Sequence, residues 1–560
     1  MKGKVDLRKV QGRFQEVWSE RQDWEPSWRG IRRLILPFRG FFEEENPKDG
    51  GNRAKEVLNG SAMRAVRTLA AGLQSGVTSP ARPWFQLNVT DPDLADMESV
   101  RSYTDEVQRR MMGVFARSNL YNSLHSLYLE MAGFATGAMM IVEDFHTGIR
   151  CRTFTAGEYA LGLGADLRVD TFARKLKMST VQLIQEFGKK SVPEEARRDY
   201  EAGVRMGRLW DVCQLIEPNP TRDAMKRDNQ NMAFRSTYWI VGEDRALRVS
   251  GFHEFPVVVP RWDVVANQAY GRGPGWEALG DVRQLQKLEE DGLIALAKMV
   301  NPPMMAPDGV RHINVMPGGV TRYSDMTSGG RAGIQPLYKI QPDLGSLRAY
   351  VADKERSIRE TFYVDLFAML SSYGGPQMTA QEVIERHEEK MIMLGPVLER
   401  LHAELLDPLI ARVYEIMSRS GLLPEVPEEL EGADLKVEYV SILAQAQKMV
   451  GMKGIQEFMG FVGQVAGMNP EVVERVDYVE LVDRAAEALG VPAGIVFGKD
   501  EFAERQAQAA EEAAQQQQMM QQMEMAKQGA GIAKDLSGVQ AGGMNGIEAL
   551  VAGMGGQQVG

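Results

Sequence analysis

Apolar residues recur at helical spacing in two long segments near the middle of the chain. One stripe covers residues 276–300 and ends at Asn301-Pro302-Pro303, and a second covers 344–370. Spacings of three and four residues place each stripe on one face of a helix. At 1.5 Å per residue these helices would each span roughly 40 Å. Two such helices cannot bury their stripes alone, so the pattern indicates packing partners beyond the single chain.

The insert between the two helices has a different pattern. Residues 302–342 are rich in proline and glycine, with apolar residues between these breakers. Apolar positions bounded by turn residues favour paired strands over disorder. The pattern therefore predicts a small β-hairpin module at one end of the helix pair.

The first 270 residues mix the helical and the strand period. Helices are predicted over 1–45, with a break at Glu25-Pro26, and over 54–75 and 94–134. An alternating strand is predicted at 85–89. Period-two runs predict short strands at 139–142, 151–154, 169–172, 238–241 and 257–262. One helix is predicted among them, near 179–188. Together with the helical segments that follow, the chain is predicted to be mixed α+β and predominantly helical.

A short loop and a long helix follow residue 370. Thr379-Ala-Gln-Glu382 has the pattern of a capping box, so a helix begins there and residues 371–378 form a loop. The helix continues to about Ser420. Gly395-Pro396 is expected to kink it, because proline lacks the N–H and collides with the preceding turn.

The last third of the chain is predicted to be mostly helical. Residues 501–528 consist largely of Ala, Gln, Glu and Met, which are strong helix formers with a weak apolar face. Such a helix needs partners, and composition does not distinguish a bundle of copies from contact with other proteins. The glycine-rich tail at 529–560 is expected to be mobile.

Composition places the chain among ordinary soluble globular proteins. Of its 560 residues 44% are hydrophobic and 25% are charged. Cys151 and Cys213 are the only cysteines, which argues against a disulfide scaffold and a multi-cysteine zinc site. The sequence has neither a membrane-spanning apolar run nor a signal peptide at its start. A net charge of −11 argues against tight nucleic-acid binding over the surface, but it does not exclude DNA that must slide.

A basic and aromatic stretch in the first 45 residues allows two interpretations. Trp28, Phe38 and several arginines lie within it, and acidic residues follow at 43–45. A helix lying on a membrane surface is one interpretation. The apolar stripe is short, however, which favours a docking helix whose arginines contact a neighbouring subunit or solvent.

The motifs of common enzymes are missing or incomplete. Gly188-Lys189-Lys190 and Gly498-Lys499-Asp500 lack the hydroxyl residue that completes a phosphate-binding loop. Glycines 271, 273 and 275 do not fit a dinucleotide fingerprint, and they favour a helix-entry loop. His387-Glu388-Glu389-Lys390-Met391 has methionine where a zinc-protease helix needs its second histidine. We therefore expect no catalytic residues, no metal and no cofactor.

Three stretches carry a resemblance to a known family. They are Trp28-Arg-Gly-Ile-Arg-Arg-Leu-Ile-Leu-Pro37, the run from Ser61 to Gly76 with Thr78-Ser-Pro-Ala-Arg-Pro-Trp84, and Tyr270-Gly-Arg-Gly-Pro274 before a helix. In these stretches the chain resembles the head-to-tail connector, or portal, proteins of short-tailed bacteriophages. The resemblance covers nearly the whole chain and is weakest after about residue 500.

The resemblance implies a division of the chain into named regions. These are a wing at 1–270, stem helices at 271–301 and 343–370, a clip at 302–342, a channel loop at 371–378, a long kinked wing helix at 379–428, a helical crown at 429–528 and a flexible tail at 529–560. It also implies a ring of twelve subunits. Head-to-tail contacts in such a ring would bury the stripes of the stem helices.

The implied function is that of a portal. The ring would sit at one capsid vertex of the virion, after assembly in the host bacterial cytoplasm, and would pass double-stranded DNA during packaging and ejection. Implied partners are the terminase motor, a tail adaptor protein, capsid and scaffolding proteins and internal ejection proteins, with no membrane. The alternative is a ring-forming tail or scaffold protein that conducts no DNA.

Candidate contact residues follow from these regions. A channel that lets DNA move in both directions cannot hold phosphates strongly, because each basic contact adds affinity through counterion release. We therefore expect steric contacts with DNA from Ser371, Ser372, Tyr373, Gln377 and Met378, and weak basic rings at Arg348 and Lys354. Arg311, His312, Arg322 and Arg331 in the basic insert are candidates for docking the motor and then the adaptor, and mere solvation of these four side chains has equal weight.

Overall fold

The computed structural model divides the chain into two compact units, Met1–Gly451 and Met452–Gly560. It describes residues 6–42, 51, 53–91, 94, 97–223, 225–226, 228–305, 312–314, 316, 335–337, 343–371, 394–430, 435–440, 458–465, 476–479, 481–482, 502, 505, 507–509, 515, 540–541 and 544–545.

Two helices open the first unit, and both bury their apolar faces. α1 spans Leu7–Glu20 and α2 spans Glu25–Leu34, so the predicted break before Pro26 is confirmed. The side chains of Phe14 and Trp18 on α1 stack and pack against a sheet. Because the apolar face of α2 is also buried in the core, neither helix has an apolar face available for a membrane surface.

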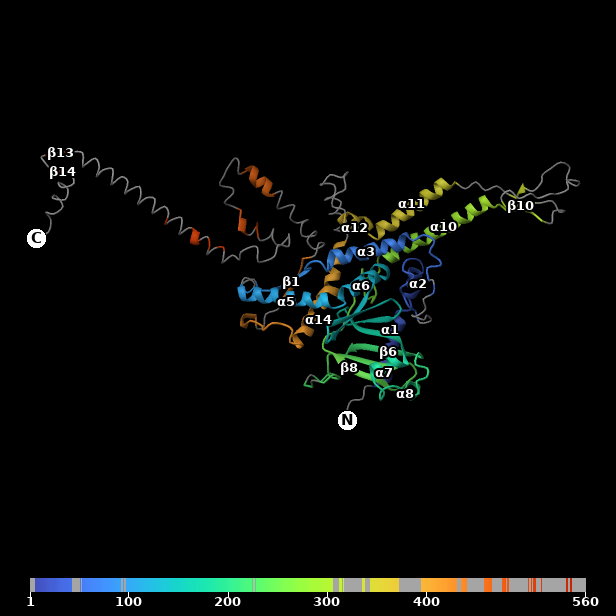
Figure 1. Ribbon diagram of the computed structural model, residues 1–560, viewed down its shortest axis with the longest axis horizontal. Helices are drawn as coiled ribbons and strands as arrows, with labels where there is room; N and C mark the ends of the chain where they lie inside the picture. The colour runs from blue at the N-terminus through green and yellow to red at the C-terminus, as the bar shows by residue number, and fades with distance from the viewer. Residues whose placement is uncertain are drawn as a thin grey trace. The chain divides into compact units, whose positions relative to one another are not determined.

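A five-stranded antiparallel sheet forms one end of this unit (Figure 1). The strand order is β4-β5-β6-β7-β8. Its strands are β4 (Tyr159–Leu163), β5 (Val169–Ser179), β6 (Leu209–Pro218), β7 (Phe234–Ile240) and β8 (Ala246–Phe252). α1 covers one face, and α7 (Thr180–Phe187) and α8 (Glu194–Glu201) cover the other. The sequence pattern predicted β5, β7 and α7 but missed β4, β6, β8 and α8.

The main core lies next to this sheet and is built mostly from helices. Its helices are α3 (Ser61–Val77), α5 (Glu98–Arg117) and α6 (Leu120–Phe134). A three-stranded sheet packs onto them in the order β3-β2-β9, with β2 at Ala138–Asp144, β3 at Gly148–Phe154 and β9 at Val257–Val258. The predicted mixed α+β class, with helices predominating, is confirmed.

The glycine-rich loop at 270–275 serves close packing of the backbone. Gly275 lies in the short helix α9 (Pro274–Glu277), and a Cβ atom placed on it would sit 1.9 Å from the carbonyl oxygen of Gly133 in α6. Glycine is the residue that permits this approach. The interpretation of a helix-entry loop agrees with this geometry.

A strand late in the chain returns to the first half. β12 (Leu435–Tyr439) pairs antiparallel with β1 (Phe85–Val89), with Phe85 opposite Tyr439. The prediction that residues past 429 are helical was wrong for this segment, because the long-range pairing decides its conformation. β1 itself was predicted.

The predicted long helix contains a wide turn. Residues 394–401 are helical, a π-helical turn follows at His402–Leu406, and α14 spans Asp407–Arg419. Pro408 follows this π-helical turn, at the start of α14, and the sequence prediction placed no irregularity there. The predicted start of this helix at Thr379 lies outside the described residues. Gly395-Pro396 lies in the first turn of the helical segment 394–401.

The second unit is described only in short pieces. Residues 458–465 are helical and expose Phe458 and Phe461. β13 (Gln540–Ala541) pairs with β14 (Met544–Asn545) inside the glycine-rich tail. Among the helices that the structure describes, none is long and apolar enough to cross a membrane.

Candidate functional site: the mid-chain helix pair

The two predicted mid-chain helices lie side by side and extend from the core (Figure 1). α10 spans Leu279–Val300 and α11 spans Leu344–Thr361. At the ends farther from the core, β10 (Met304–Met305) pairs antiparallel with β11 (Gln335–Pro336). The predicted insert therefore begins and ends in a paired strand, although most of it lies outside the described residues.

A polar network fixes the base of the helix pair to the core. The Gln286 side-chain oxygen accepts bonds from the backbone N–H groups of Leu58 (2.7 Å) and Asn59 (2.9 Å), and its amide nitrogen donates to the Asn59 carbonyl (2.8 Å). The Asn59 amide in turn donates to Glu289 on α10 and to Glu355 on α11. One loop thus joins both helices.

Replacing Gln286 with leucine tests this network. The variant keeps the volume but leaves two partly buried N–H groups unpaired, so we expect a loss of about 1 kcal/mol in the free energy of unfolding. Chemical denaturation measures this loss of stability. The exposed Gln284 on the same helix provides the matched control, and an equal loss from Gln284→Leu would contradict the assignment.

A charged pair ties the two helices together nearer the start of α10. Asp281 on α10 accepts a bond from Lys354 (2.9 Å) and from the hydroxyl of Ser357 (2.6 Å) on α11. These bonds hold the pKa of Asp281 below its usual value. The Lys354 ammonium is half-buried and balanced by this carboxylate, so the structure gives it a role in joining the helices.

The helix pair should loosen in acid. Hydrogen bonds from Asn59 and Ser61 also lower the pKa of Glu355. A carboxyl group whose pKa is lowered in the folded state stabilises the protein at pH values above its unfolded-state pKa, which is about 4 for both groups. This stabilisation is lost as the pH falls through the folded-state pKa. We expect Asp281→Asn with Glu355→Gln to reduce the fall in melting temperature between pH 6 and pH 3. An unchanged acid response would contradict this, and the exposed Glu360→Gln is the control.

The outer half of α10 leaves its apolar stripe uncovered. Near the base Val282 and Leu285 are fully buried, whereas Leu293, Leu296 and Val300 are 56%, 41% and 68% exposed. These three residues follow the i, i+3, i+7 spacing of one helix face. The two helices are nevertheless in close contact, because a Cβ atom on Gly292 would lie 2.9 Å from Leu347. Leu296 lies four residues from Gly292, so the stripe runs along the flank of α10 beside the α11 contact and is still exposed.

The second helix is broken, in contrast to the continuous helix predicted over 344–370. α11 ends at Thr361 and α12 spans Val364–Ser371. Tyr363 between them has a φ of 53°, in the left-handed region that a tyrosine rarely adopts. Its ring lies 6.0 Å from that of Trp262, and Phe367 packs onto Gly72 of α3. These contacts from distant segments impose the break.

The structure places a minority of the predicted contact residues. Arg348 is exposed on α11, and His312 is exposed in the insert. Ser371 is the last residue of α12. The remaining candidates, apart from Lys354, lie outside the described residues: Ser372, Tyr373, Gln377, Met378, Arg311, Arg322 and Arg331.

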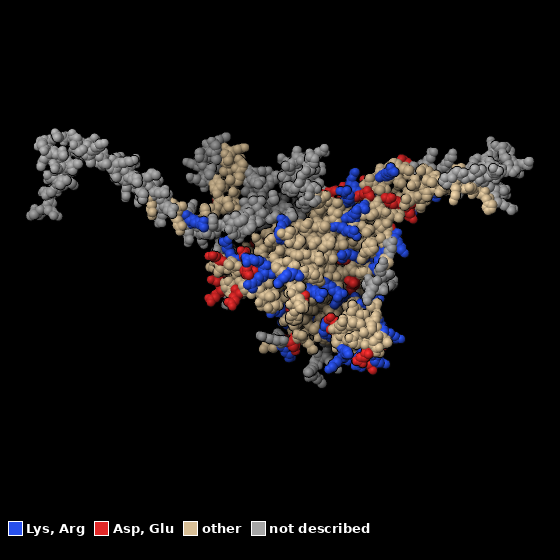
Figure 2. All heavy atoms as spheres, in the orientation of Figure 1, with Lys and Arg blue, Asp and Glu red and all other residues tan. Residues whose placement is uncertain are grey.

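The charged side chains on the described surface are of both signs. Figure 2 shows basic and acidic side chains interspersed over the first unit, helix pair included. Within the described ranges, no group of three or more His, Cys, Asp or Glu side chains could hold a metal ion. Both cysteines are buried, and burial raises the pKa of the Cys151 thiol to about 12.

Comparison with known proteins identifies the family. The family described as "Bacteriophage head to tail connecting protein" matches residues 7–496. The chain belongs to this family. It is also 37% identical to the probable portal protein of Bordetella phage BPP-1 over 98% of both chains. Its identity to the portal protein of Salmonella phage epsilon15 is 38%, over 97% of both chains.

Solved structures with some likeness come from gene transfer agent particles. The neck of an empty particle matches at 11% identity with a TM-score of 0.31, covering 78% of this chain and 90% of that chain. A chain of the native virion matches at 11% identity with a TM-score of 0.29, covering 70% of this chain and 89% of that chain.

The resemblance to the portal proteins of short-tailed phages is confirmed by the family and its two relatives. As a portal protein, the connector is a structural component of the virion at the capsid vertex.

Proposed function

We propose that copies of this connector close into a ring around an axial channel, and that double-stranded DNA passes through this channel during packaging and ejection. The uncovered stripe of α10 is the observation that carries the proposal. Leu293, Leu296 and Val300 line up on a helix that extends beyond its own core. Exposed apolar surface of this kind marks a contact with another protein. In a ring, each copy supplies the missing cover to the next.

The ring number proposed from the family resemblance is twelve. The proposed regions are those predicted from the sequence, with α10 and α11 as the stem, the insert as the clip and the segment from Ser371 as the channel loop. The helix break at Tyr363 supports a change of direction just before that loop.

The role of the ring toward DNA would be passive. Lys354 is balanced by Asp281, which leaves Arg348 as the remaining candidate for a weak basic ring. A sparse set of phosphate contacts lets a duplex slide. We infer a structural protein without catalysis, which docks the terminase motor and later the tail adaptor through the clip.

Electron microscopy of the purified protein tests the proposal. A closed ring with an axial hole about one duplex wide is the expected result. Filaments, closed discs or monomers would contradict it and favour a tail or scaffold protein that conducts no DNA.

Shortening the channel loop tests the passage of DNA. Replacing residues 371–378 with a shorter glycine linker is expected to reduce the DNA retained in assembled particles. Retention equal to that of the unaltered protein would remove the loop from the mechanism.

Charge reversal in the insert tests the docking surface. Arg322→Glu with Arg331→Glu is expected to weaken the pull-down of the tail adaptor. Undiminished capture would mean that these side chains are merely solvated.

A further inference from the structure

The five-stranded sheet of the first unit ends in an open edge. β8 is the last strand, and β7 is its one partner strand. Among the described residues, no backbone group of β8 makes a hydrogen bond other than those to β7. The pairing with β7 skips Leu247, and from Arg248 onward the edge presents N–H and C=O groups at strand spacing, with which an extended peptide can pair as an added strand.

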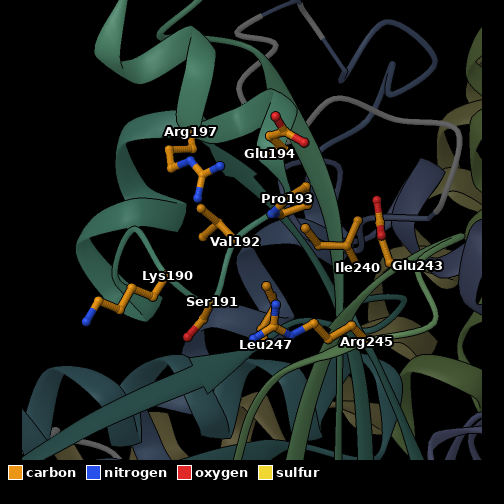
Figure 3. A pocket seen from close by; sticks show the side chains of 10 residues that line it. All are labelled: Lys190, Ser191, Val192, Pro193, Glu194, Arg197, Ile240, Glu243, Arg245 and Leu247. Atoms are coloured by element: carbon orange, nitrogen blue, oxygen red, sulfur yellow. The ribbon is translucent and has the colours of Figure 1, made fainter.

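A pocket of about 260 Å³ opens beside the start of this edge (Figure 3). It lies where the turn between β7 and β8 meets the linker between α7 and α8. Its apolar side consists of Val192, Pro193, Ile240 and Leu247. In Figure 3 the side chains of Arg197 and Arg245 lie on opposite sides of the set of pocket-lining side chains, and Arg197 points toward Val192.

The charges around the pocket favour an acidic ligand. Its basic lining residues are Lys190, Arg197 and Arg245, against Glu194 and Glu243. Within the described part of the chain neither arginine makes an ion pair. Arginine forms forked, charge-assisted bonds to carboxylates, and the apolar side can hold an aliphatic side chain between two such bonds.

We propose that β8 and this pocket dock an extended acidic segment of a second protein. The segment adds as a strand along β8 and places an apolar side chain between Arg197 and Arg245, with carboxylates two residues away on either side, on the same face of the strand. This surface goes beyond the proposed passage of DNA. It also lies across the core from α10 and α11, so enclosure of the helix pair by other copies leaves it open (Figure 1).

Binding of a synthetic peptide to the full chain tests the proposal. A labelled peptide in which glutamates lie two residues before and two residues after a valine, with serine between them, is compared by fluorescence anisotropy with the matched peptide that has lysine in place of each glutamate. We expect the acidic peptide to bind more tightly. Arg197→Glu with Arg245→Glu should weaken it about tenfold or more, because like charges then face each other.

The matched control reverses two other charges on the same sheet. Arg168 and Lys177 are exposed on its β4–β5 turn and on β5, and Arg168→Glu with Lys177→Glu should leave the affinity within about twofold, as expected for distant surface charges. Backbone amide exchange at 246–250 should slow when the acidic peptide is added, because an added strand protects these groups.

Three results would overturn the inference. Equal affinity for both peptides would remove the charge argument, and unaltered exchange at 246–250 would exclude strand addition. A changed oligomeric state of Arg197→Glu with Arg245→Glu would mean that the surface joins copies of this chain. Ring formation by the unaltered protein is measured separately by electron microscopy, so failure here is distinct from failure of the proposed connector function.

Discussion

Aspartate at positions 293 and 300 is expected to abolish ring formation while the single chain stays folded. Leu293 and Val300 are more than half exposed in the protomer, so the double variant removes little packing within one copy. Inside a ring the same positions would be buried against the next copy. A carboxylate buried there without a partner costs several kcal/mol per contact, and the ring repeats that cost at every interface.

Mass photometry of the purified variant measures the outcome directly. Unaltered protein should form one large species, and the double variant should remain a single copy with an unchanged melting temperature. Val204 and Val241 are similarly exposed but lie away from α10, so Val204→Asp with Val241→Asp is the matched control. Rings of normal size from the α10 variant would show that this stripe faces solvent or a different protein.

Alanine at position 275 is expected to lower the free energy of unfolding by about 3 kcal/mol or more. The added Cβ atom would lie 1.9 Å from the Gly133 oxygen and 2.8 Å from its carbonyl carbon. Both are backbone atoms, so no side-chain rotation relieves the overlap. α9 and α6 would have to separate, at the point where α10 leaves the core.

Gly280 supplies the control on the neighbouring helix. A Cβ atom there meets nothing within 4 Å, so Gly280→Ala should be neutral or stabilise by up to about 1 kcal/mol through helix propensity. Urea denaturation of both variants separates the two effects. Equal stability of the Gly275 and Gly280 variants would mean that the backbone moves freely at Gly275.

Local signals predicted the elements that local interactions hold in place. The side chains of Ser179 and Gln182 form a reciprocal capping box at the start of α7, and a helix was expected there. α10 also followed its apolar stripe. The family resemblance rested on similar short stretches, which include the loop before α9.

Features that depend on distant segments were missed. The break at Tyr363 is fixed by Trp262 and by Phe367 on Gly72, and nothing in the helical stripe signals either contact. The partner of Lys354 is Asp281, on the other helix. Lys354 was expected in a weak basic ring of the channel, whereas its side chain joins the two helices. β12 was read as helical because its strand partner, β1, lies near the other end of the unit.

The pairing of β1 with β12 also constrains how the protein is made. During synthesis β1 emerges early and cannot find its partner until residues 435–439 have left the ribosome. Contacts between such distant segments form slowly, and unpaired strand edges attract wrong partners in the meantime. A nascent chain whose translation stops short of β12 would therefore present a β1 edge prone to aggregation.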